Sequence, residues 1–353
     1  MILYRIADKI IFNILKKIEI GYLEITSTTG ELLRFGNYND KLKADLKIKS
    51  SVLSYNLIKG GSVGLAESYM KNEFETSNLS NLIELAARNI NIVHKFTGIL
   101  DLKFLNFIKN KFVKNTKSEK RNAILEPKSL ATRKCSEMTL NALTNQNHNL
   151  IGGSADLAGS NNTKTKHQKI IKPGDFSGDY IHYGVREHGM SGVMNGISLY
   201  GNLIPYGGTF LIFSDYCKPS IRLSALMQKR VIYVMTHDSI GLGEDGPTHQ
   251  PIEQLSGLRS IPNLNVFRPA DRVETIECWE HALKSSKTPS ILSLTRQGLN
   301  PIRKSFTNIN KCSFGAYEVL RTNNKINLTI FASGSEVNLA IETGHKLAKD
   351  KIY

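Results

Sequence analysis

The sequence has 353 residues, of which 41% are hydrophobic and 22% are charged, and its formal net charge is +15. These values are ordinary for a globular chain of two or three domains, and we do not expect a disordered protein. The positive charge could favour phosphorylated metabolites, anionic lipid or nucleic acid, but lysines scattered over polar surfaces would give the same total. Charge alone therefore selects no function, and we predict no nucleic-acid partner.

The four cysteines lie far apart in the sequence and form no Cys-x-x-Cys pair; they are Cys135, Cys217, Cys278 and Cys312. This spacing argues against a zinc cluster or a disulfide-bonded scaffold and is typical of reduced thiols. No run of residues approaches the roughly 18 apolar positions of a membrane span, and the start has no small-residue cleavage site after an apolar core. We therefore expect a cytoplasmic protein.

Residues 1–18 place apolar side chains at helical spacing, with Lys9, Lys16 and Lys17 at other positions. This pattern predicts an amphipathic basic helix, which either packs on its own domain or lies at an anionic membrane surface. The following residues predict a small α+β domain. Its expected elements are a hairpin formed by residues 20–25 and 31–35, a strand at 44–48, and helices at 51–58 and 79–88.

Four short motifs follow one another in this region: Gly21-Tyr-Leu-Glu-Ile25, Gly30-Glu-Leu-Leu-Arg-Phe-Gly36, Gly64-Leu-Ala-Glu-Ser-Tyr-Met70 and Asn78-Leu79. Over residues 10–123 they resemble the N-terminal domain of cyclopropane-fatty-acyl-phospholipid synthase-like methyltransferases. In that family the domain helps the enzyme to engage phospholipid. Asn115-Thr116 and Lys120-Arg-Asn122 resemble the basic segment before the catalytic domain, but Ile124-Leu-Glu-Pro-Lys128 replaces the expected His-Tyr-Asp. No Gly-rich turn for S-adenosylmethionine follows, so methyl transfer is not predicted.

From Ala131 onward, short apolar runs alternate with helical patterns. This order predicts an α/β fold with a doubly wound, mostly parallel sheet. The expected strands are 149–151, 180–183, 203–206, 231–235, 265–267 and 290–294, with helices at 132–143, at 190–200 and before 226.

A polar or aromatic residue follows each predicted strand: Asp156, Glu187, Phe210, His237, Arg268 and Arg296. Ligands of open α/β sheets bind beyond the carboxyl ends of the strands, so one edge of the sheet is expected to be a site. The Gly241–Pro251 loop, rich in glycine, aspartate and histidine, lies at the same edge. The alternative is a surface loop with unrelated histidines.

Six longer motifs recur in order: Ala131-Thr-Arg-Lys134, Gly152-Gly-Ser-Ala-Asp-Leu157, Tyr183-Gly-Val-Arg-Glu-His-Gly-Met190, Ile204-Pro-Tyr-Gly-Gly-Thr-Phe210, Thr236-His-Asp-Ser-Ile-Gly-Leu-Gly-Glu-Asp-Gly-Pro-Thr-His-Gln-Pro251 and Arg268-Pro-Ala-Asp271. They resemble the pyrimidine-binding domain of transketolase over residues 128–300, with the start of that family's C-terminal domain reaching residue 353. The resemblance implies thiamine diphosphate as the cofactor and two-carbon ketol transfer between sugar phosphates, a reaction of the pentose phosphate pathway.

The resemblance also implies roles for single residues. A carboxylic acid at Glu187 can hydrogen-bond the aminopyrimidine nitrogen of the cofactor and favour its imino tautomer. Phe210, Phe213 and Tyr216 match residues that pack on the pyrimidine, although three aromatic residues on one helical face could equally fill a core. We expect no metal at His182 or His188, since no carboxylate or thiol stands at ligand spacing.

Two further sets of residues are expected to contact the substrate. Arg133, Ser160, His237 and Arg296 match positions that hold the sugar phosphate, where a guanidinium can bind oxyanions through two hydrogen bonds. Asp245 and His249 match residues that hydrogen-bond the substrate hydroxyl groups. With Glu187 and His237, these two residues form the predicted catalytic set.

The family's Gly-Asp-Gly motif, which holds the cofactor diphosphate through Mg²⁺, is missing from the sequence. We therefore expect the isolated chain to bind the cofactor weakly and to be inactive without a diphosphate-binding chain, in a homodimer or hetero-oligomer. The end of the chain predicts strands at 314–320 and 328–331 and a helix at 336–349, the beginning of a truncated α/β domain.

These observations predict a cyclopropane-synthase-like N-terminal domain at 1–123, a junction at 124–130, a pyrimidine-binding domain at 131–304 and the truncated domain at 305–353. Three hypotheses remain open. The chain is one half of a split transketolase, a non-catalytic protein that associates peripherally with lipid, or an inactive product of gene rearrangement.

Overall fold

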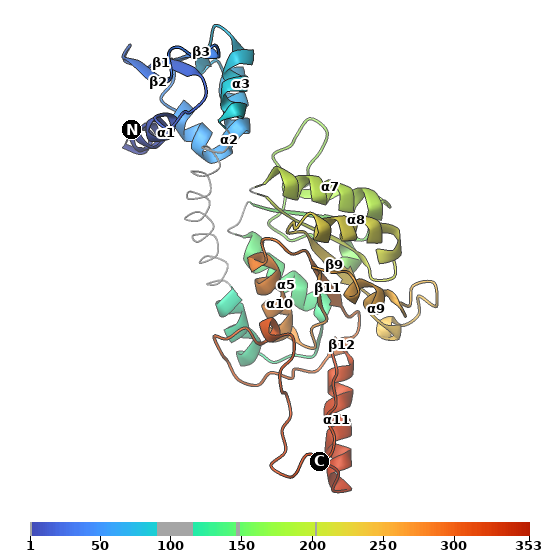
Figure 1. Cartoon of the computed structure of the whole chain (residues 1–353). Coiled ribbons are helices and arrows are strands. Elements are labelled where there is room, and N and C mark those ends of the chain that lie inside the picture. Colours follow the sequence, from blue (N-terminus) through green and yellow to red (C-terminus); the bar gives the residue numbers. More distant parts are fainter. Residues whose placement is uncertain (1, 90–115, 146–148, 202) are drawn as a thin grey trace. The chain divides into compact units, whose positions relative to one another are not determined.

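The computed structural model describes residues 2–89, 116–145, 149–201 and 203–353 (Figure 1). The chain divides into two compact units, Met1–Ile108 and Lys109–Tyr353. The predicted linker residue Asn115 lies outside the described residues, and the predicted domain limits at 123, 130 and 304 stay predictions.

The described residues of the first unit form a four-stranded sheet in the order β2-β1-β3-β4 and three helices. The expected hairpin forms, because β1 and β2 pair antiparallel and Gly30 takes a positive φ of 83° at the turn. Helix α2 continues well beyond its predicted end at residue 58. The elements are α1 (Ile2–Leu15), β1 (Tyr22–Thr26), β2 (Leu32–Gly36), β3 (Lys43–Ile48), α2 (Leu53–Met70), β4 (Phe74–Glu75) and α3 (Leu79–Arg88).

Helix α1 packs on the core of its own unit through the side that carries Phe12 and Leu15. Phe12 and Leu15, together with Ile18 just after the helix, contact the buried cluster that includes Leu23 and Phe35. The rings of Phe12 and Phe35 stack with centroids 6.2 Å apart. Of the two readings of this amphipathic helix, the contacts therefore favour packing on its own domain. No helix in the described part of the chain is long and apolar enough to cross a membrane.

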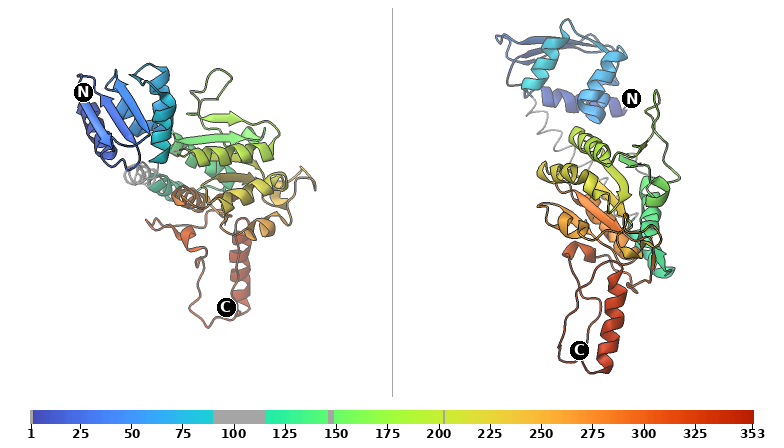
Figure 2. Two further views of the ribbon diagram at one scale, coloured as in Figure 1. Left: turned by 45° about the horizontal axis from the view of Figure 1, so that its top comes forward. Right: turned by 90° about the vertical axis from the view of Figure 1, so that its right-hand side faces the viewer.

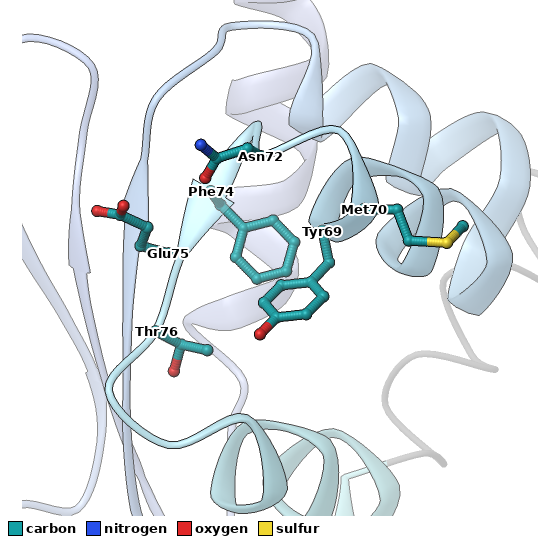
Figure 3. A pocket seen from close by; sticks show the side chains of 6 residues that line it. All are labelled: Tyr69, Met70, Asn72, Phe74, Glu75 and Thr76. Atoms are coloured by element: carbon teal, nitrogen blue, oxygen red, sulfur yellow. The ribbon is translucent and has the colours of Figure 1, made fainter.

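An open pocket of about 420 Å³ lies in the first unit, where α2 ends and β4 begins (Figure 3). The Tyr69 and Phe74 rings face each other there at a centroid distance of 5.5 Å, and Asn72 and Glu75 both accept hydrogen bonds from the Lys49 amine. No histidine or cysteine is among the described residues that line it. The pocket offers an aromatic wall without an arrangement for acid–base or nucleophilic chemistry.

The second unit contains a six-stranded sheet in the order β10-β11-β9-β8-β6-β7, in which every neighbouring pair is parallel. This confirms the predicted α/β fold. The strands are β6 (Leu150–Ser154), β7 (Tyr180–His182), β8 (Ile204–Phe210), β9 (Ile232–Thr236), β10 (Asn265–Phe267) and β11 (Ser290–Leu294). A separate short pair joins β5 (Leu130–Ala131) and β12 (Gly298–Leu299) antiparallel.

Helices cover both faces of this sheet (Figure 2). The α7 methionines 190 and 194 pack with Tyr233 on one face, and a Cβ at Gly207 would stand 2.7 Å from the Met194 sulfur. On the other face, Tyr206 meets the fully buried Trp279 of α10 at a ring distance of 5.8 Å. Besides a helix at 116–125, the α-helices in the described part of this unit are α5 (Thr132–Thr144), α6 (Ala158–Asn161), α7 (Glu187–Tyr200), α8 (Ser214–Leu226), α9 (Gln254–Arg259), α10 (Arg272–Lys284) and α11 (Glu336–Lys349).

The carboxyl ends of the central strands lie at one edge of the sheet. The register pairs Thr236, the last residue of β9, with both Phe210 and Leu294, the last residues of β8 and β11. After β6 the chain first adds β7 on one side and then β8 on the other, so the direction of winding reverses there. Ligands of doubly wound folds bind at such a reversal.

The C-terminal segment differs from its prediction. Residues 314–320 and 328–331 are not strands, because no neighbouring strand among the described residues offers them a hydrogen-bonding edge. Their apolar side chains remain exposed, and Phe331 is 86% accessible. Helix α11 forms at the predicted residues 336–349.

A buried ionic cluster joins three segments of the second unit. The Glu277 carboxylate of α10 lies 2.7 Å from the Lys120 amine, which comes from the helix at 116–125, and 3.4 Å from the Arg303 guanidinium. It also accepts hydrogen bonds from the backbone N–H groups of Lys311 and Cys312, at 2.8 and 3.2 Å. Burial alone would raise the pKa of Glu277, but the two cations outweigh burial and lower it.

Candidate active site

The carboxyl edge of the sheet carries a compact group of rings. The Phe210 ring, at the end of β8, lies 3.7 Å from the imidazole of His237 and 5.6 Å from the Phe213 ring, which is nearly parallel to it. His249, from the Gly241–Pro251 loop, meets both phenylalanines edge-on at 5.9 and 5.4 Å. Tyr216 touches Phe213 at 5.8 Å but is 64% exposed. The structure thus brings four predicted site residues together, with Tyr216 at the margin.

His237 follows β9 directly and has a left-handed backbone with φ of +60°. A non-glycine residue rarely adopts this conformation outside turns and functional sites. Its imidazole is buried, and the Asp245 carboxylate lies 4.0 Å from Nε2, beyond hydrogen-bond distance. Burial, with the positive charges of Arg133 and Arg296, lowers the pKa of His237 to about 4. The ring is therefore neutral at pH 7.

Two guanidinium groups flank the ring group. Arg133, in the first turn of α5, donates from Nη1 to the Ser160 carbonyl oxygen at 2.8 Å. Arg296, two residues after β11, donates to the Leu242 carbonyl at 2.6 Å and pairs with Glu244 at 2.7 Å. Burial and the charge of Arg296 lower the pKa of Arg133. The two cations are thus close enough to repel each other, an arrangement that an anion between them would stabilise.

The Gly241–Pro251 loop owes its path to residues with positive φ. Gly243 has φ of +95° and Gly246 has φ of +81°. A Cβ at Gly243 would also stand 3.0 Å from Arg296 Nη1. The loop carries Asp245 between these two glycines and places His249 against the phenylalanine rings, and the His249 backbone N–H donates to the Gly246 carbonyl at 3.1 Å.

Glu187 approaches the same strand end from the other face of the sheet. It is the first residue of α7, is 7% exposed, and accepts a hydrogen bond from the Thr209 hydroxyl at 3.5 Å. Thr209 precedes Phe210 in β8, and successive side chains of a strand point to opposite faces. Glu187 and the ring group are therefore neighbours through β8.

The two histidines that could suggest a metal are separate from this site. His182 is exposed beside Tyr180, and His188 contacts the Ser220 hydroxyl at 3.3 Å. Among the residues with described positions, no group of three histidine, cysteine, aspartate or glutamate side chains could hold a metal ion.

Sequence reasoning assigned no role to several residues that shape the site. Arg268 donates from Nε to Asp238 Oδ2 at 2.7 Å and also pairs with Glu336 at the start of α11. Asp238 follows His237 directly, and burial raises its pKa although Arg268 lies against it. We refer to Asp238, Arg268 and Glu336 as the Arg268 clamp. Arg268 stood out as a polar residue after a strand, but its partners, 30 and 68 residues away, could not be read from the sequence.

Asn161 is a second residue of this kind. It is completely buried at the end of α6, and its side-chain amide bonds to β6, β8 and β9. Its position directly after Ser160 was the only available signal. The contacts with β8 and β9 join residues 48 and 75 positions apart, so the pattern of residues alone does not reveal them.

The family model described as the transketolase pyrimidine-binding domain matches residues 128–301. The transketolase of Sinorhizobium medicae (strain WSM419) is 54% identical over 222 residues, which are 63% of this chain and 32% of that protein. The transketolase of Cereibacter sphaeroides is 55% identical over 227 residues, 64% of this chain and 34% of that protein. The chain thus spans about a third of the length of these curated relatives.

Solved structures show the same likeness. Transketolase from Leishmania mexicana superposes with a TM-score of 0.63 and 39% identity, covering 76% of this chain and 40% of that one. A Pichia stipitis transketolase in complex with sedoheptulose 7-phosphate gives a TM-score of 0.64 and 38% identity, covering 82% and 43%. Motif order, sheet topology and these matches agree that residues 128–301 are similar to the pyrimidine-binding domain of transketolases.

Proposed function

We propose that this chain contributes the pyrimidine-binding and substrate-binding face of a transketolase site, which transfers a two-carbon ketol unit between sugar phosphates. The observation that carries the proposal is the ring group of Phe210, Phe213, His237 and His249 at the carboxyl edge of the sheet, flanked by two arginines. Flat aromatic surfaces suit a pyrimidine ring, and clustered cations suit a phosphate.

The residues present fit thiamine diphosphate at its pyrimidine end. Phe210 and Phe213 lie with only 11° between their ring planes, and the Glu187 carboxyl is held in a buried position at the start of α7. In this proposal Glu187 hydrogen-bonds the aminopyrimidine nitrogen, while Phe210, Phe213 and Tyr216 pack against the ring. When bound, the cofactor supplies the carbanion chemistry that carries the two-carbon unit.

The substrate phosphate is proposed to lie between Arg133, His237 and Arg296, near Ser160. Two guanidinium groups provide charge and several N–H donors, which match phosphate oxygens in geometry. Asp245 and His249, on the loop beside them, would hydrogen-bond the sugar hydroxyl groups and orient the reacting carbons. A neutral imidazole at His237 adds a donor without adding a third positive charge.

The diphosphate and Mg²⁺ require a further component in this proposal. The 353 residues contain no Gly-Asp-Gly sequence, and we propose that a diphosphate-binding chain completes the site in a homodimer or hetero-oligomer. For residues 10–123 we retain the proposed relation to cyclopropane-synthase-like methyltransferases, which rests on their sequence motifs. We do not extend it to lipid binding, because the described core contacts of α1, those of Phe12 and Leu15, are made within its own unit.

Calorimetric titration with thiamine diphosphate and Mg²⁺ tests the proposal. The purified chain is titrated alone and with a separately expressed diphosphate-binding domain. Binding that requires the added domain and weakens in Glu187→Gln supports a shared site. His182→Gln, at an exposed histidine away from the ring group, should leave the affinity unchanged. Absence of binding in both mixtures would count against the proposal and favour the non-catalytic alternatives.

A further inference from the structure

The buried amide of Asn161 has a fixed orientation. Its Nδ2 lies 3.1 Å from the Thr209 carbonyl oxygen, which can only accept, so the amide nitrogen must face that side. On the opposite side Oδ1 lies 3.1 Å from the Ser154 hydroxyl, whose one proton is shared between Oδ1 and the Gly208 carbonyl oxygen, also at 3.1 Å. The second N–H of the amide then points to Thr236 Oγ1 at 2.7 Å. Asn161 therefore acts as a hydrogen-bond donor to the Thr236 hydroxyl.

The Thr236 hydroxyl is in turn hydrogen-bonded to the His237 imidazole. Its oxygen lies 2.9 Å from His237 Nδ1. A hydroxyl has a single proton, and because the oxygen already accepts from Asn161, the proton is free to be donated to the imidazole. A protonated Nδ1 would instead donate to the second lone pair of Oγ1, and the proton of the buried Thr236 hydroxyl would lose the acceptor that its described contacts offer. The contacts therefore favour Nδ1 as the acceptor, with the one proton of the neutral ring on Nε2.

We propose that Asn161 and Thr236 are positioning residues that fix His237 as the neutral tautomer with its proton on Nε2. The inference about the tautomer stands on the hydrogen bonds alone. Its consequence for substrate, a donor presented to an anion between Arg133 and Arg296, rests on the proposed function.

The groups around the imidazole are consistent with this state. Arg133 from α5, Arg296 after β11 and His249 from the loop disfavour a further positive charge, and Asp245 from the same loop favours it. Burial is the largest cause disfavouring the charged ring, and together with Arg133, Arg296 and His249 it lowers the pKa of His237 to about 4. A neutral ring can donate a hydrogen bond to an oxyanion only from a protonated nitrogen, and Nε2 faces the side of Asp245.

Nitrogen-15 NMR of the full chain, labelled in its nine histidines, measures the tautomer directly. His237→Gln identifies the resonances of His237 by their loss. The expected spectrum at pH 7 has an unprotonated, hydrogen-bonded Nδ1 and a protonated Nε2. A protonated Nδ1 in the unmodified chain would overturn the proposal, whatever the behaviour of the variants.

Three variants test the chain of hydrogen bonds. Asn161→Asp replaces the donor by an acceptor of the same shape, so Thr236 should donate to residue 161 and the His237 proton should move to Nδ1. Thr236→Val should shift Nδ1 to the position of a free imine nitrogen, and Thr236→Ser should restore it. Thr144→Val removes a buried hydroxyl with unrelated partners and should leave His237 unchanged. Equal effects of Thr144→Val and Thr236→Val would mean a general loss of packing and would refute the relay.

Inorganic phosphate separates the two levels of the argument. If the proposed function holds, phosphate should shift the Nε2 resonance in the unmodified chain and bind at least several-fold more weakly in Asn161→Asp. A correct tautomer with no response to phosphate would retain the relay and remove the phosphate role of His237. A response to phosphate together with a proton on Nδ1 would retain the phosphate role of His237 and refute the hydrogen-bond relay.

Discussion

Replacing Glu277 by glutamine should destabilise the second unit strongly. The Glu277 side chain has no exposed surface, and the side chains of its partners Lys120 and Arg303 are only 3% and 6% exposed. The substitution keeps the shape but leaves two buried cations without their counter-charge. Breaking a buried ion pair from one side costs about 3–5 kcal/mol, because the remaining charge stays desolvated. We expect the free energy of unfolding to fall by about that amount.

Urea unfolding followed by tryptophan fluorescence measures this loss in the second unit alone. Trp279 is the only tryptophan of the chain, is completely buried, and lies two residues after Glu277 in α10. With a slope of about 1–3 kcal/mol per molar urea, the midpoint should fall by about 1 M or more. A single cooperative transition would also argue against a poorly folded, rearranged product.

Glu137→Gln provides the matched control. Glu137 pairs with Lys134 on the surface of α5, one turn away, with 23% and 54% of the two side chains exposed. Surface pairs of this kind contribute less than about 1 kcal/mol. If Glu277→Gln lowers the midpoint no more than Glu137→Gln does, the argument that burial makes the Glu277 cluster costly to break is wrong.

Three further outcomes are expected. The pKa of His237 is about 4 in the folded chain and about 6.5 in the unfolded chain, so the unfolded state binds its proton first as the pH falls. The free energy of unfolding should therefore fall by up to about 3 kcal/mol between pH 6.5 and pH 4. In urea titrations, His237→Gln should flatten this pH dependence. Gly243→Ala should cost about 1–3 kcal/mol, because φ is +95° there, and should weaken phosphate binding through Arg296, as read by NMR titration; unchanged stability would contradict the strain argument. Arg268→Met should speed hydrogen exchange in α11, which loses the pairing of Arg268 with Glu336, while α9 amides remain protected; equal acceleration in both helices would indicate global destabilisation instead.

The central sheet was predictable because its strands carry their own signal. The run from Val231 to Met235 is apolar without interruption, as expected for a strand covered on both faces, and the strand found there is shifted by one residue. Helix α3 was predicted at its observed bounds, and the Asn78 side chain caps it by accepting from the Asn81 N–H. Local chemistry was sufficient in both cases.

Helix α10 was not predicted, and its buried residues explain why. Glu274 and Glu277 lie on its buried surface, where a sequence pattern would place apolar side chains. Glu274 is satisfied by the Tyr317 hydroxyl, and Glu277 by Lys120 and Arg303. Pairing over such distances in sequence overrides the local pattern. The wrongly predicted strands at 314–320 and 328–331 fail for the complementary reason, since apolar alternation creates a strand only beside a partner edge.

At the site, too, some features were predictable from local sequence and others depend on contacts between distant residues. The residues of the ring group could be placed at one sheet edge from the order of strands and motifs, because parallel strands share the position of their ends. Their tilt, the left-handed backbone at His237 and the buried amide of Asn161 depend on contacts between separate elements. These features became visible only in three dimensions.

The Arg268 clamp has a consequence for the order in which the chain acquires its structure during synthesis. The strands that carry Phe210 and His237 are complete long before residue 336 is made. Arg268 reaches its full set of partners only when Glu336, 68 residues later, has left the ribosome and α11 has begun to form. Asp238, the residue after His237, pairs with Arg268, and Arg268 completes its own set of contacts only when Glu336 is present. A nascent chain should therefore build its sheet early and set the final geometry beside His237 last.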